Sequence, residues 1–340
     1  MSFVASLQRP YIIAEMSGNH NQSLERALEI VDAAARSGAH ALKLQTYTAD
    51  TITMRGAYTI EDTNSLWAGS ELYDLYQQAY TPWEWHQPIF ERARALGMDA
   101  FSSPFDETAV DFLETLNVPL YKIASFENTH HPLLRKVART GKPVIMSTGV
   151  SSFEDISESV DVLKSAGCKE IILLKCTSTY PATPENTNLL TIPAMRERWH
   201  CEIGLSDHTM GIGVALAAVG LGVRVIEKHF TLSRADGGVD SAFSMEPSEM
   251  KALVDESLKA YQSLGKVQTN VQVVEEKSLL FKRSIYASKD IAAGENLSDT
   301  NLKIIRPALG LAPKHWEEVC GKKALVAIKA GQPLSWDIIE

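Results

Sequence analysis

Short apolar runs alternate with longer amphipathic stretches along the first 265 positions of the chain. Runs that are rich in Ile, Val, Leu and Phe and bounded by polar residues are typical of buried β-strands. The eight runs are Tyr11–Glu15, Ala41–Tyr47, Met98–Ser103, Leu120–Ser125, Pro143–Thr148, Glu170–Ser178, Glu202–Ser206 and Val223–Phe230. Helical spacing of apolar positions lies between or after them in Leu24–Ser37, Thr108–Leu116, Leu133–Thr140, Phe153–Ala166 and Pro247–Leu264. Eight β-α units in about 260 residues predict a (β/α)₈ barrel, an α/β fold.

The alternative fold is a doubly wound sheet, which normally has a Gly-rich turn after its first strand. Here that turn reads Glu15-Met-Ser-Gly-Asn-His-Asn21 and lacks the G-x-G-x-x-G spacing, so the barrel is preferred. The second unit is oversized. Its segment Asn64–Leu96 holds three of the six tryptophans and is predicted as an inserted helical excursion, whose aromatic side chains are most simply explained by packing.

The pattern changes after Gly265, which predicts three regions. Residues 1–265 form the barrel domain, residues 266–282 a polar linker, and residues 283–340 a small β-rich domain. Within this last region the run Ile291–Ser298 is echoed by Ile328–Ser335. Each copy places a glycine where a tight turn needs positive φ, followed by an apolar anchor. A region of about 58 residues forms a marginal core by itself, so it is expected to dock on another body.

Composition narrows the classes of function. The formal net charge of −9 argues against a nucleic-acid partner, and an anionic substrate would need a local cluster of cationic side chains. No run of about 18 apolar residues is present to span a membrane, and residues 1–10 lack the pattern of a secretory leader. The four cysteines have no C-x-x-C spacing, which favours a reducing, cytoplasmic compartment over a disulfide framework or zinc knuckle.

Polar residues gather at the carboxyl ends of the predicted strands, where barrel enzymes build their sites. In chain order they are Glu15, Asn19, His20, Lys43, Gln45, Ser103, Lys122, Ser125, Glu127, Ser147, Lys175, Ser178, Tyr180, Ser206, Asp207, His208, Glu227, Lys228 and His229. Any one lysine is equally well explained by a side chain that reaches the rim. Lysines in four strands, with hydroxyls at the ends of five, predict together a pocket for a phosphate and a carboxylate.

Two histidines, His208 and His229, end neighbouring strands, so their imidazoles could converge on one ion. A single histidine at a strand end is more often a hydrogen-bonded core residue, but a pair beside an anion pocket favours a divalent cation. Imidazoles with oxygen ligands or water suit Mn²⁺, Mg²⁺, Co²⁺ or Zn²⁺. Asp207 and Glu227 are expected to orient these ligands by accepting hydrogen bonds.

Eight short motifs resemble, in the same order, those of the sialic acid synthase family. They are Ile12–Asn21, Lys43–Tyr47, Phe101–Phe105, Tyr121–Ser125, Met146–Gly149, Cys176–Pro181, Gly204–His208 and Ile226–Phe230, and they cover nearly the whole predicted barrel. The tail, with Ile305-Arg306-Pro307, resembles the antifreeze-like (SAF) domain that ends these enzymes.

The resemblance implies a transferase that uses phosphoenolpyruvate and an N-acetylated amino sugar. Phosphoenolpyruvate would be held by Lys43, Ser103, Lys122, Ser125, Ser147, Ser178 and Ser206, and the metal by His208 and His229. The open-chain sugar would be read by Glu15, Tyr180 and Asp240, with Glu15 also handling a proton. Asn19, Gln45, Glu127 and Lys175 are added to the substrate-binding set. Arg306 would reach in from the SAF domain of a second subunit, which implies a domain-swapped homodimer.

Within the family the chain is most similar to the pseudaminic acid synthase branch, in Lys43–Thr48, Tyr80–His86, Ser125–Glu127, Leu174–Tyr180 and Asp240–Ser244. N-acetylneuraminate synthases typically have His in place of Lys175 and Asn in place of Ser178. The implied reaction condenses phosphoenolpyruvate with 2,4-diacetamido-2,4,6-trideoxy-L-altrose and water, and it releases phosphate by C–O cleavage. Three alternatives stay open: neuraminate or legionaminate synthesis, a Schiff-base aldolase at Lys122, and a sugar-binding protein without catalysis.

Overall fold

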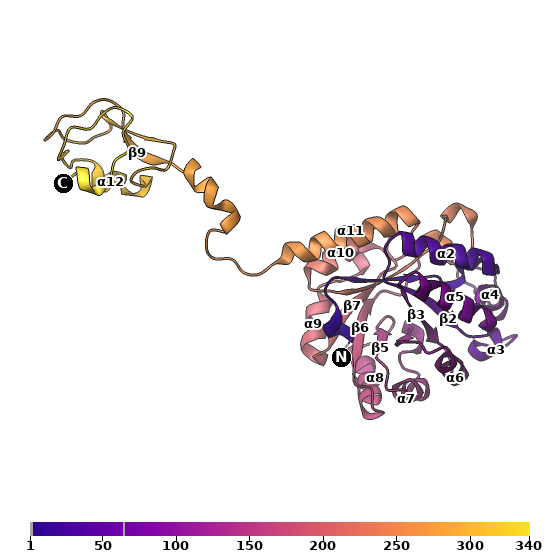
Figure 1. Ribbon diagram of the computed structural model, residues 1–340. Helices are drawn as coiled ribbons and strands as arrows, with labels where there is room; N and C mark the ends of the chain where they lie inside the picture. The colour runs from indigo at the N-terminus through magenta and orange to yellow at the C-terminus, as the bar shows by residue number, and fades with distance from the viewer. Residues whose placement is uncertain (1–2, 64) are drawn as a thin grey trace. The chain divides into compact units, whose positions relative to one another are not determined.

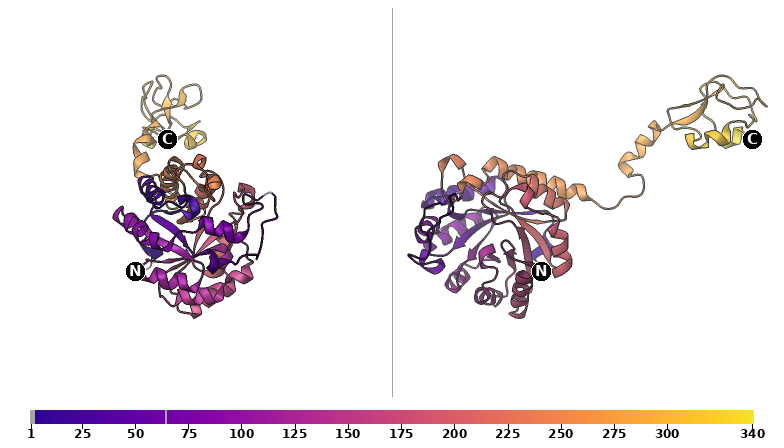
Figure 2. Two further views of the ribbon diagram at one scale, coloured as in Figure 1. Left: turned by 90° about the vertical axis from the view of Figure 1, so that its right-hand side faces the viewer. Right: turned by 180° about the vertical axis from the view of Figure 1, so that it is seen from behind.

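The computed structural model describes residues 3–63 and 65–340, and the chain divides into units of residues 1–265 and 266–340. In the first unit eight parallel strands form a barrel that helices surround (Figure 1, Figure 2). The strands are β1 Tyr11–Glu15, β2 Ala41–Thr46, β3 Asp99–Pro104, β4 Tyr121–Ile123, β5 Val144–Ser147, β6 Ile171–Cys176, β7 Glu202–Ser206 and β8 Val225–His229. Their order is β3-β2-β1-β8-β7-β6-β5-β4. Within the described residues no ladder joins β3 to β4, although the two strands pack together. The predicted (β/α)₈ barrel is confirmed.

The helices follow the strands in sequence and cover their outer faces. They are α2 Leu24–Arg36, α5 Trp83–Ala95, α6 Glu107–Thr115, α7 His131–Ala138, α8 Phe153–Ser165, α9 Thr191–Trp199, α10 Gly213–Gly220 and α11 Pro247–Leu264. Local signals set their starts: the hydroxyl of Ser152 accepts from the amide of Asp155, whose carboxylate accepts in turn from Ser152. Helix α11 packs against both α10 and α2, so the ring of helices closes.

The strands are buried on both faces, which explains their continuous apolar runs. All residues of β1 and β6 are buried. Inside the barrel, Gly204 of β7 leaves room for Leu174 of β6, because a Cβ at this position would collide with the Leu174 side chain and the carbonyl of Val225. The core therefore fills both the lumen and the layer under the helices.

The excursion after β2 contains α3 Ala49–Ile52 and α4 Leu72–Ala79, and α5 then serves as the regular barrel helix between β2 and β3. The predicted segment 64–96 is thus an insertion only in part, and Asn64 lies outside the described residues. Two of its tryptophans pack as expected: Trp83 stacks on Phe112 at 4.7 Å between ring centroids, and Trp85 meets His20 edge-on at 5.7 Å. Trp67 instead lines a cavity.

The second unit begins with an exposed segment that includes the 3₁₀ helix Val273–Phe281. Antiparallel strands β9 Ser284–Ala287 and β10 Leu302–Ile305 follow, and α12 spans Trp316–Val319. The two repeat copies pair with each other, since Ile291 and Ile328 exchange backbone hydrogen bonds of 2.9 Å in both directions. Both repeat glycines have positive φ, 81° at Gly294 and 83° at Gly331, as the turn pattern predicts. Across the described ranges, 3–63 and 65–340, no helix has the length and apolar character needed to cross a bilayer.

Candidate active site

The pairing of neighbouring strands brings the polar residues at the strand ends to a similar height along the barrel axis. Glu15 of β1 pairs with Lys43 of β2 on one side and with His229 of β8 on the other. Gln45 pairs with Ser103, and Ser206 pairs with Glu227 and Cys176. Because parallel strands point the same way, these side chains meet at the carboxyl end of the barrel.

Two lysines and two glutamates form a buried cluster there. Lys43 makes an ion pair with Glu15, and its Nζ lies 3.7 Å from Oε1 of Glu227. Nζ of Lys122 lies 3.9 Å from the same oxygen. Serine hydroxyls complete the shell: Lys43 donates to Ser103 at 3.3 Å, Lys122 to Ser147 at 2.7 Å, and Ser206 to Glu227 at 3.4 Å. The structure thus brings together two ammonium groups and three hydroxyls, the donors that a phosphate and a carboxylate require.

The charges of this cluster shift one another's pKa values. Burial raises the pKa of Glu15, although Lys43 opposes the change. Burial alone would lower the pKa of Lys43, but the carboxylates of Glu15 and Glu227 outweigh it and raise that pKa. At Lys122 burial prevails and the pKa falls, whereas at Glu227 the two lysines overcome burial and lower the pKa. Glu15 therefore holds a proton at higher pH than an ordinary glutamate does, which suits an acid-base group.

Two further serines meet at Gly149, after β5. The amide of Gly149 donates to the hydroxyl of Ser125 at 3.1 Å, and a Cβ on this glycine would collide with the hydroxyls of Ser125 and Ser178. Only glycine leaves space for both side chains. Ser125 and Ser178, which come from the ends of β4 and β6, therefore lie together at the mouth of the barrel.

The imidazoles of His208 and His229 lie side by side, with 5.3 Å between ring centroids. Nδ1 of His208 lies 2.9 Å from the carbonyl oxygen of Thr177. A carbonyl oxygen only accepts, so Nδ1 carries the hydrogen and the lone pair of Nε2 remains available. In the described part of the chain, Nδ1 of His229 is buried without a hydrogen-bond partner.

These two rings fit a divalent cation as a pair of nitrogen ligands. A carbonyl-anchored imidazole and a buried, unpartnered imidazole nitrogen are what a metal-binding histidine pair presents. Within residues 3–63 and 65–340, no group of three His, Cys, Asp or Glu side chains is arranged to hold a metal. The remaining ligands would be oxygens of substrate or water, as in a site that stays open for chemistry.

A polar chain leads from the charged cluster to Asp240, in the loop after β8. Gln45 donates to Oε1 of Glu15 and to the hydroxyl of Ser17, each at 3.1 Å. Ser17 donates in turn to Asp240, which burial gives a raised pKa. These groups offer alternating donors and acceptors, which are suited to hydroxyls of a sugar.

Aromatic rings form one wall beside the histidines. The ring of Tyr180 lies 4.5 Å from His208 and 5.2 Å from Phe243, and Phe243 lies 4.9 Å from His229. Trp67, from the excursion after β2, reaches within 6.0 Å of Tyr180. The wall presents apolar faces and one phenol to whatever binds beside the two histidines.

Several predicted residues are not brought into this group. Asn19 is buried and donates to the carbonyl of Phe230 and to Ser244, and so ties loops together. Lys175 lies on the opposite face of β6 from Cys176, because side chains alternate along a strand. Its ammonium group donates to the hydroxyl of Thr177 at 2.8 Å and to the carbonyl of Cys176 at 3.3 Å.

The expectation that Asp207 orients a metal ligand is wrong. Asp207 accepts from Lys228 at 2.9 Å and from the backbone and hydroxyl of Thr209. Lys228 alternates with Glu227 and His229 and so points out of the lumen. The cationic cluster therefore contains two of the four strand lysines. Glu227 faces the cluster as expected but accepts from Ser206 rather than from a histidine.

Of two other predicted residues, Glu127 lies near enough to the charged cluster to interact with both of its lysines, whereas Arg306 lies in the other unit. Glu127 follows β4, and burial raises its pKa to about 7 although Lys122 and Lys43 oppose the change. Arg306 belongs to the second unit, directly after β10, and its side chain is exposed.

Residues that strand-end reasoning missed complete the group. Ser17 and Phe243 lie in the short 3₁₀ helices Ser17–His20 and Ser241–Phe243, outside the strands and α-helices, and have no periodic signal. Cys176 looks like an apolar strand residue, yet its sulfur lies 3.9 Å from Nδ1 of His208 and 3.7 Å from the hydroxyl of Ser178. The sequence did contain one signal that Cys176 could face the lumen. It follows Lys175 in the predicted strand, and one of two neighbouring strand residues must face the lumen.

Comparison with known families gives two matches. The NeuB family model matches residues 30–269, and the SAF domain model matches residues 282–340. The solved N-acetylneuraminic acid synthetase of Leptospira borgpetersenii superposes with a TM-score of 0.71 at 31% sequence identity, covering 80% of this chain and 90% of that one.

Curated relatives match over nearly their whole length. The pseudaminic acid synthase of Campylobacter jejuni is 43% identical, with 96% of each chain covered. That of Helicobacter pylori is 43% identical, with 98% of this chain and 99% of the relative covered. The N,N'-diacetyllegionaminic acid synthase of Legionella pneumophila is 36% identical, with 97% and 94% covered.

Proposed function

Because the chain belongs to the NeuB family and ends in a SAF domain, we propose that it is a pseudaminic acid synthase. It condenses phosphoenolpyruvate with 2,4-diacetamido-2,4,6-trideoxy-L-altrose and water to give pseudaminic acid and phosphate. The identity to two pseudaminic acid synthases over nearly the full chain, 43% against 36% for a legionaminic acid synthase, carries the choice of acceptor.

The geometry of the barrel mouth supports the condensing chemistry. Lys43 and Lys122, with Ser103 and Ser147, bind the phosphate and carboxylate of phosphoenolpyruvate. Ser125, Ser178 and Ser206 add hydroxyl donors at the same level. These preorganised donors stabilise negative charge throughout the reaction.

The bond changes balance without an added oxidant or reductant. The alkene carbon of phosphoenolpyruvate attacks the sugar aldehyde, which forms a C–C bond and leaves a cationic carbon bearing the phosphate oxygen. Water adds to that carbon and loses a proton, and the C–O bond to phosphate breaks to release inorganic phosphate and the keto acid. Glu15, buried beside Lys43 with a raised pKa, is the group that donates a proton to the former aldehyde oxygen.

His208 and His229 would hold a divalent cation, Mn²⁺, Mg²⁺ or Co²⁺, that supplies Lewis-acid polarisation of the aldehyde oxygen when bound. Asp240, Tyr180 and Gln45 orient the sugar hydroxyls. Arg306 of a second subunit completes the site in a domain-swapped homodimer. The four free thiols suit a cytoplasmic location.

Phosphate release in the presence of Mn²⁺ tests this proposal. Purified protein and phosphoenolpyruvate are incubated with 2,4-diacetamido-2,4,6-trideoxy-altrose, with its mannose isomer, or with N-acetylmannosamine. Release with the altrose sugar is expected. Preference for the mannose isomer would make the protein a legionaminate synthase, preference for N-acetylmannosamine a neuraminate synthase, and no release with any sugar would contradict the synthase class.

One observation leaves room for a Schiff-base aldolase. Burial lowers the pKa of Lys122, which is what an amine nucleophile needs. The carboxylate of Glu227 at 3.9 Å opposes this by favouring the ammonium form. Borohydride added during turnover should therefore leave Lys122 unmodified, and a trapped adduct seen by mass spectrometry would favour the aldolase.

A further inference from the structure

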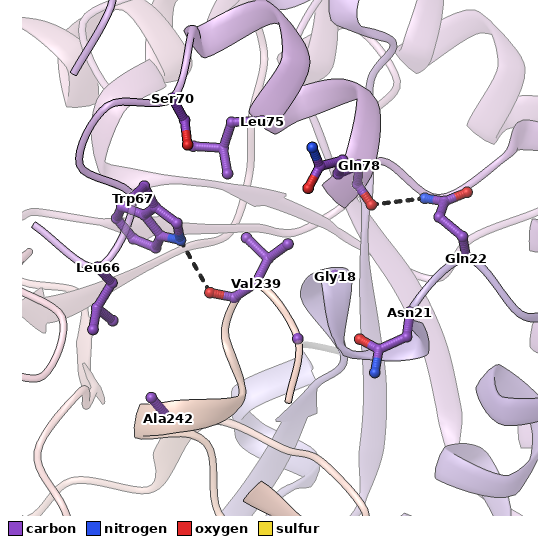
Figure 3. A pocket seen from close by; sticks show the side chains of 11 residues that line it. Gly18, Asn21, Gln22, Leu66, Trp67, Ser70, Leu75, Gln78, Val239 and Ala242 are labelled. Carbon is purple, nitrogen blue, oxygen red and sulfur yellow. Dashed lines mark hydrogen bonds between the residues drawn. The ribbon is translucent and has the colours of Figure 1, made fainter. Parts of the chain in front are cut away.

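A cavity of about 530 Å³ lies at the carboxyl end of the barrel, between three segments that are far apart in sequence (Figure 3). The loop after β1, the excursion with α4, and the loop after β8 each supply part of its wall. The lining residues are Gly18, Asn21, Gln22, Leu66, Trp67, Ser70, Leu75, Gln78, Gly238, Val239 and Ala242.

The cavity shares walls with the active site. Gly18 follows Ser17, the hydroxyl that donates to Asp240, and the amide of Gly18 also bonds the Asp240 carboxylate. Val239 directly precedes Asp240, and Trp67 lies 6.0 Å from the ring of Tyr180. A molecule held by Asp240 and Tyr180 can therefore extend into the cavity.

The chemistry of the wall is neutral. Among the described residues that line it, none has a charged side chain, so an ammonium or carboxylate group would find no counter-charge there. Leu66, Trp67, Leu75, Val239 and Ala242 offer apolar surface, while the amides of Asn21, Gln22 and Gln78 offer hydrogen bonds. Methyl groups next to amides are the complement of such a wall, and an acetamido group has both.

Hydrogen bonds fix two sides of the wall, as Figure 3 shows. Nε1 of Trp67 donates to the carbonyl of Val239 at 3.0 Å and so holds the indole in place. The Gln22 amide nitrogen donates to the carbonyls of Gln78 at 2.9 Å and Tyr80 at 2.8 Å, which leaves its oxygen as an acceptor. At Gly238, φ is +126° and a side chain would collide with Asn21, so only glycine suits this position.

We propose that this cavity binds the distal half of the acceptor sugar, its C4 acetamido group and C6 methyl group, and selects acceptors that carry both. The inference rests on the proposed function. With the aldehyde at the histidine pair and hydroxyls at Asp240, the far end of the chain reaches the indole of Trp67. The acetamido and methyl groups at that end are both uncharged, which suits a cavity whose described lining residues have no charged side chain.

The test compares two acceptors that differ only at C4: the diacetamido sugar, and the same sugar without its 4-acetamido group. Ala242→Phe fills the cavity without removing any hydrogen bond, and Trp67→Ala removes its aromatic wall. Each variant should lower kcat/KM for the diacetamido sugar by about tenfold or more, and Ala242→Phe should change it little for the sugar without the group. The KM for phosphoenolpyruvate should stay unchanged.

Tyr58→Ala is the matched control, because Tyr58 lies in the same excursion, is 53% exposed and does not line the cavity. Equal loss with both acceptors, or no loss in Ala242→Phe, would overturn the inference. A wild-type protein that uses both acceptors equally well would also overturn it while leaving the synthase function intact. Wild-type protein that releases phosphate with neither acceptor would overturn function and inference together.

Discussion

Nδ1 of His208 donates to the backbone carbonyl of Thr177 across 2.9 Å. This bond sets the ring tautomer and leaves Nε2 free, so the loop after β6 orients a side chain that belongs to the end of β7. The hydroxyl of Thr177 is itself anchored, since it accepts from Lys175 at 2.8 Å and donates to the carbonyl of Asn186 at 3.1 Å.

Lys175 is therefore expected to act as a positioning residue. Lys175→Met removes the bond to Thr177 and should lower kcat by about tenfold, a usual cost of losing an outer-shell partner, with the KM for either substrate little changed. Lys175→Arg, which keeps donors, should recover part of that loss. A rise in substrate KM with unchanged kcat would instead assign Lys175 to direct substrate binding.

His208→Ala and His229→Ala should each abolish tight Mn²⁺ binding, because one imidazole alone makes a weak site. Electron paramagnetic resonance of free Mn²⁺ measures this directly, and phosphate release should fall on the order of a hundredfold or more. His130→Ala is the control, since this histidine is exposed at the start of α7. Retained Mn²⁺ binding in both active-site variants would contradict the metal assignment.

The proposed domain-swapped site predicts complementation between two inactive proteins. Arg306→Ala lacks the arginine, and His208→Ala lacks a proposed metal ligand. When the two are co-produced in equal amounts, half of the dimers are mixed and each has one complete site, so activity should return to about a quarter of wild type. If each subunit uses its own Arg306, co-production restores no activity.

Glu127 gives a pH-dependent stability difference. Its pKa in the folded protein is about 7, raised by burial, so the folded state holds a proton that the unfolded state releases at lower pH. The stabilisation by this proton is present below about pH 4.5 and is lost as pH rises to about 7. Glu127→Gln has no titrating group at this position. The difference in free energy of unfolding between variant and wild type should therefore shift in favour of the variant as pH rises through this range, by up to about 3 kcal/mol. Urea denaturation at several pH values measures the gain, and a constant difference would refute the assignment.

Gly204 and Gly220 form a matched pair for packing. Gly204→Ala places a Cβ against Leu174 and the Val225 carbonyl, and should destabilise the barrel by about 1–3 kcal/mol. Gly220→Ala, at the end of α10, meets nothing within 4 Å and should be neutral or stabilising by about 0.5 kcal/mol. Thermal unfolding compares the two, and equal melting temperatures would argue against the tight contact at β7.

The amino-acid sequence by itself determined that the fold is a barrel and that the site lies at the carboxyl ends of its strands. Eight apolar runs with polar ends predict parallel strands, and the barrel topology then requires Glu15, Lys43, Lys122, His208 and His229 to share one end. The two glycines of the C-terminal repeat likewise predict their turns, because few other residues adopt positive φ there. Local sequence patterns are therefore sufficient to predict those features that backbone geometry alone determines.

Only the tertiary structure decided which face each strand-end residue takes. Strands covered on both sides have no polar alternation to mark the lumen, so Lys175 and Lys228 look equivalent to Lys43 and Lys122 in sequence. In the fold, Lys175 supports Thr177 and Lys228 supports Asp207, while Cys176 faces the lumen. The cavity at Trp67 likewise depends on three loops from distant parts of the chain, whose meeting no local pattern specifies.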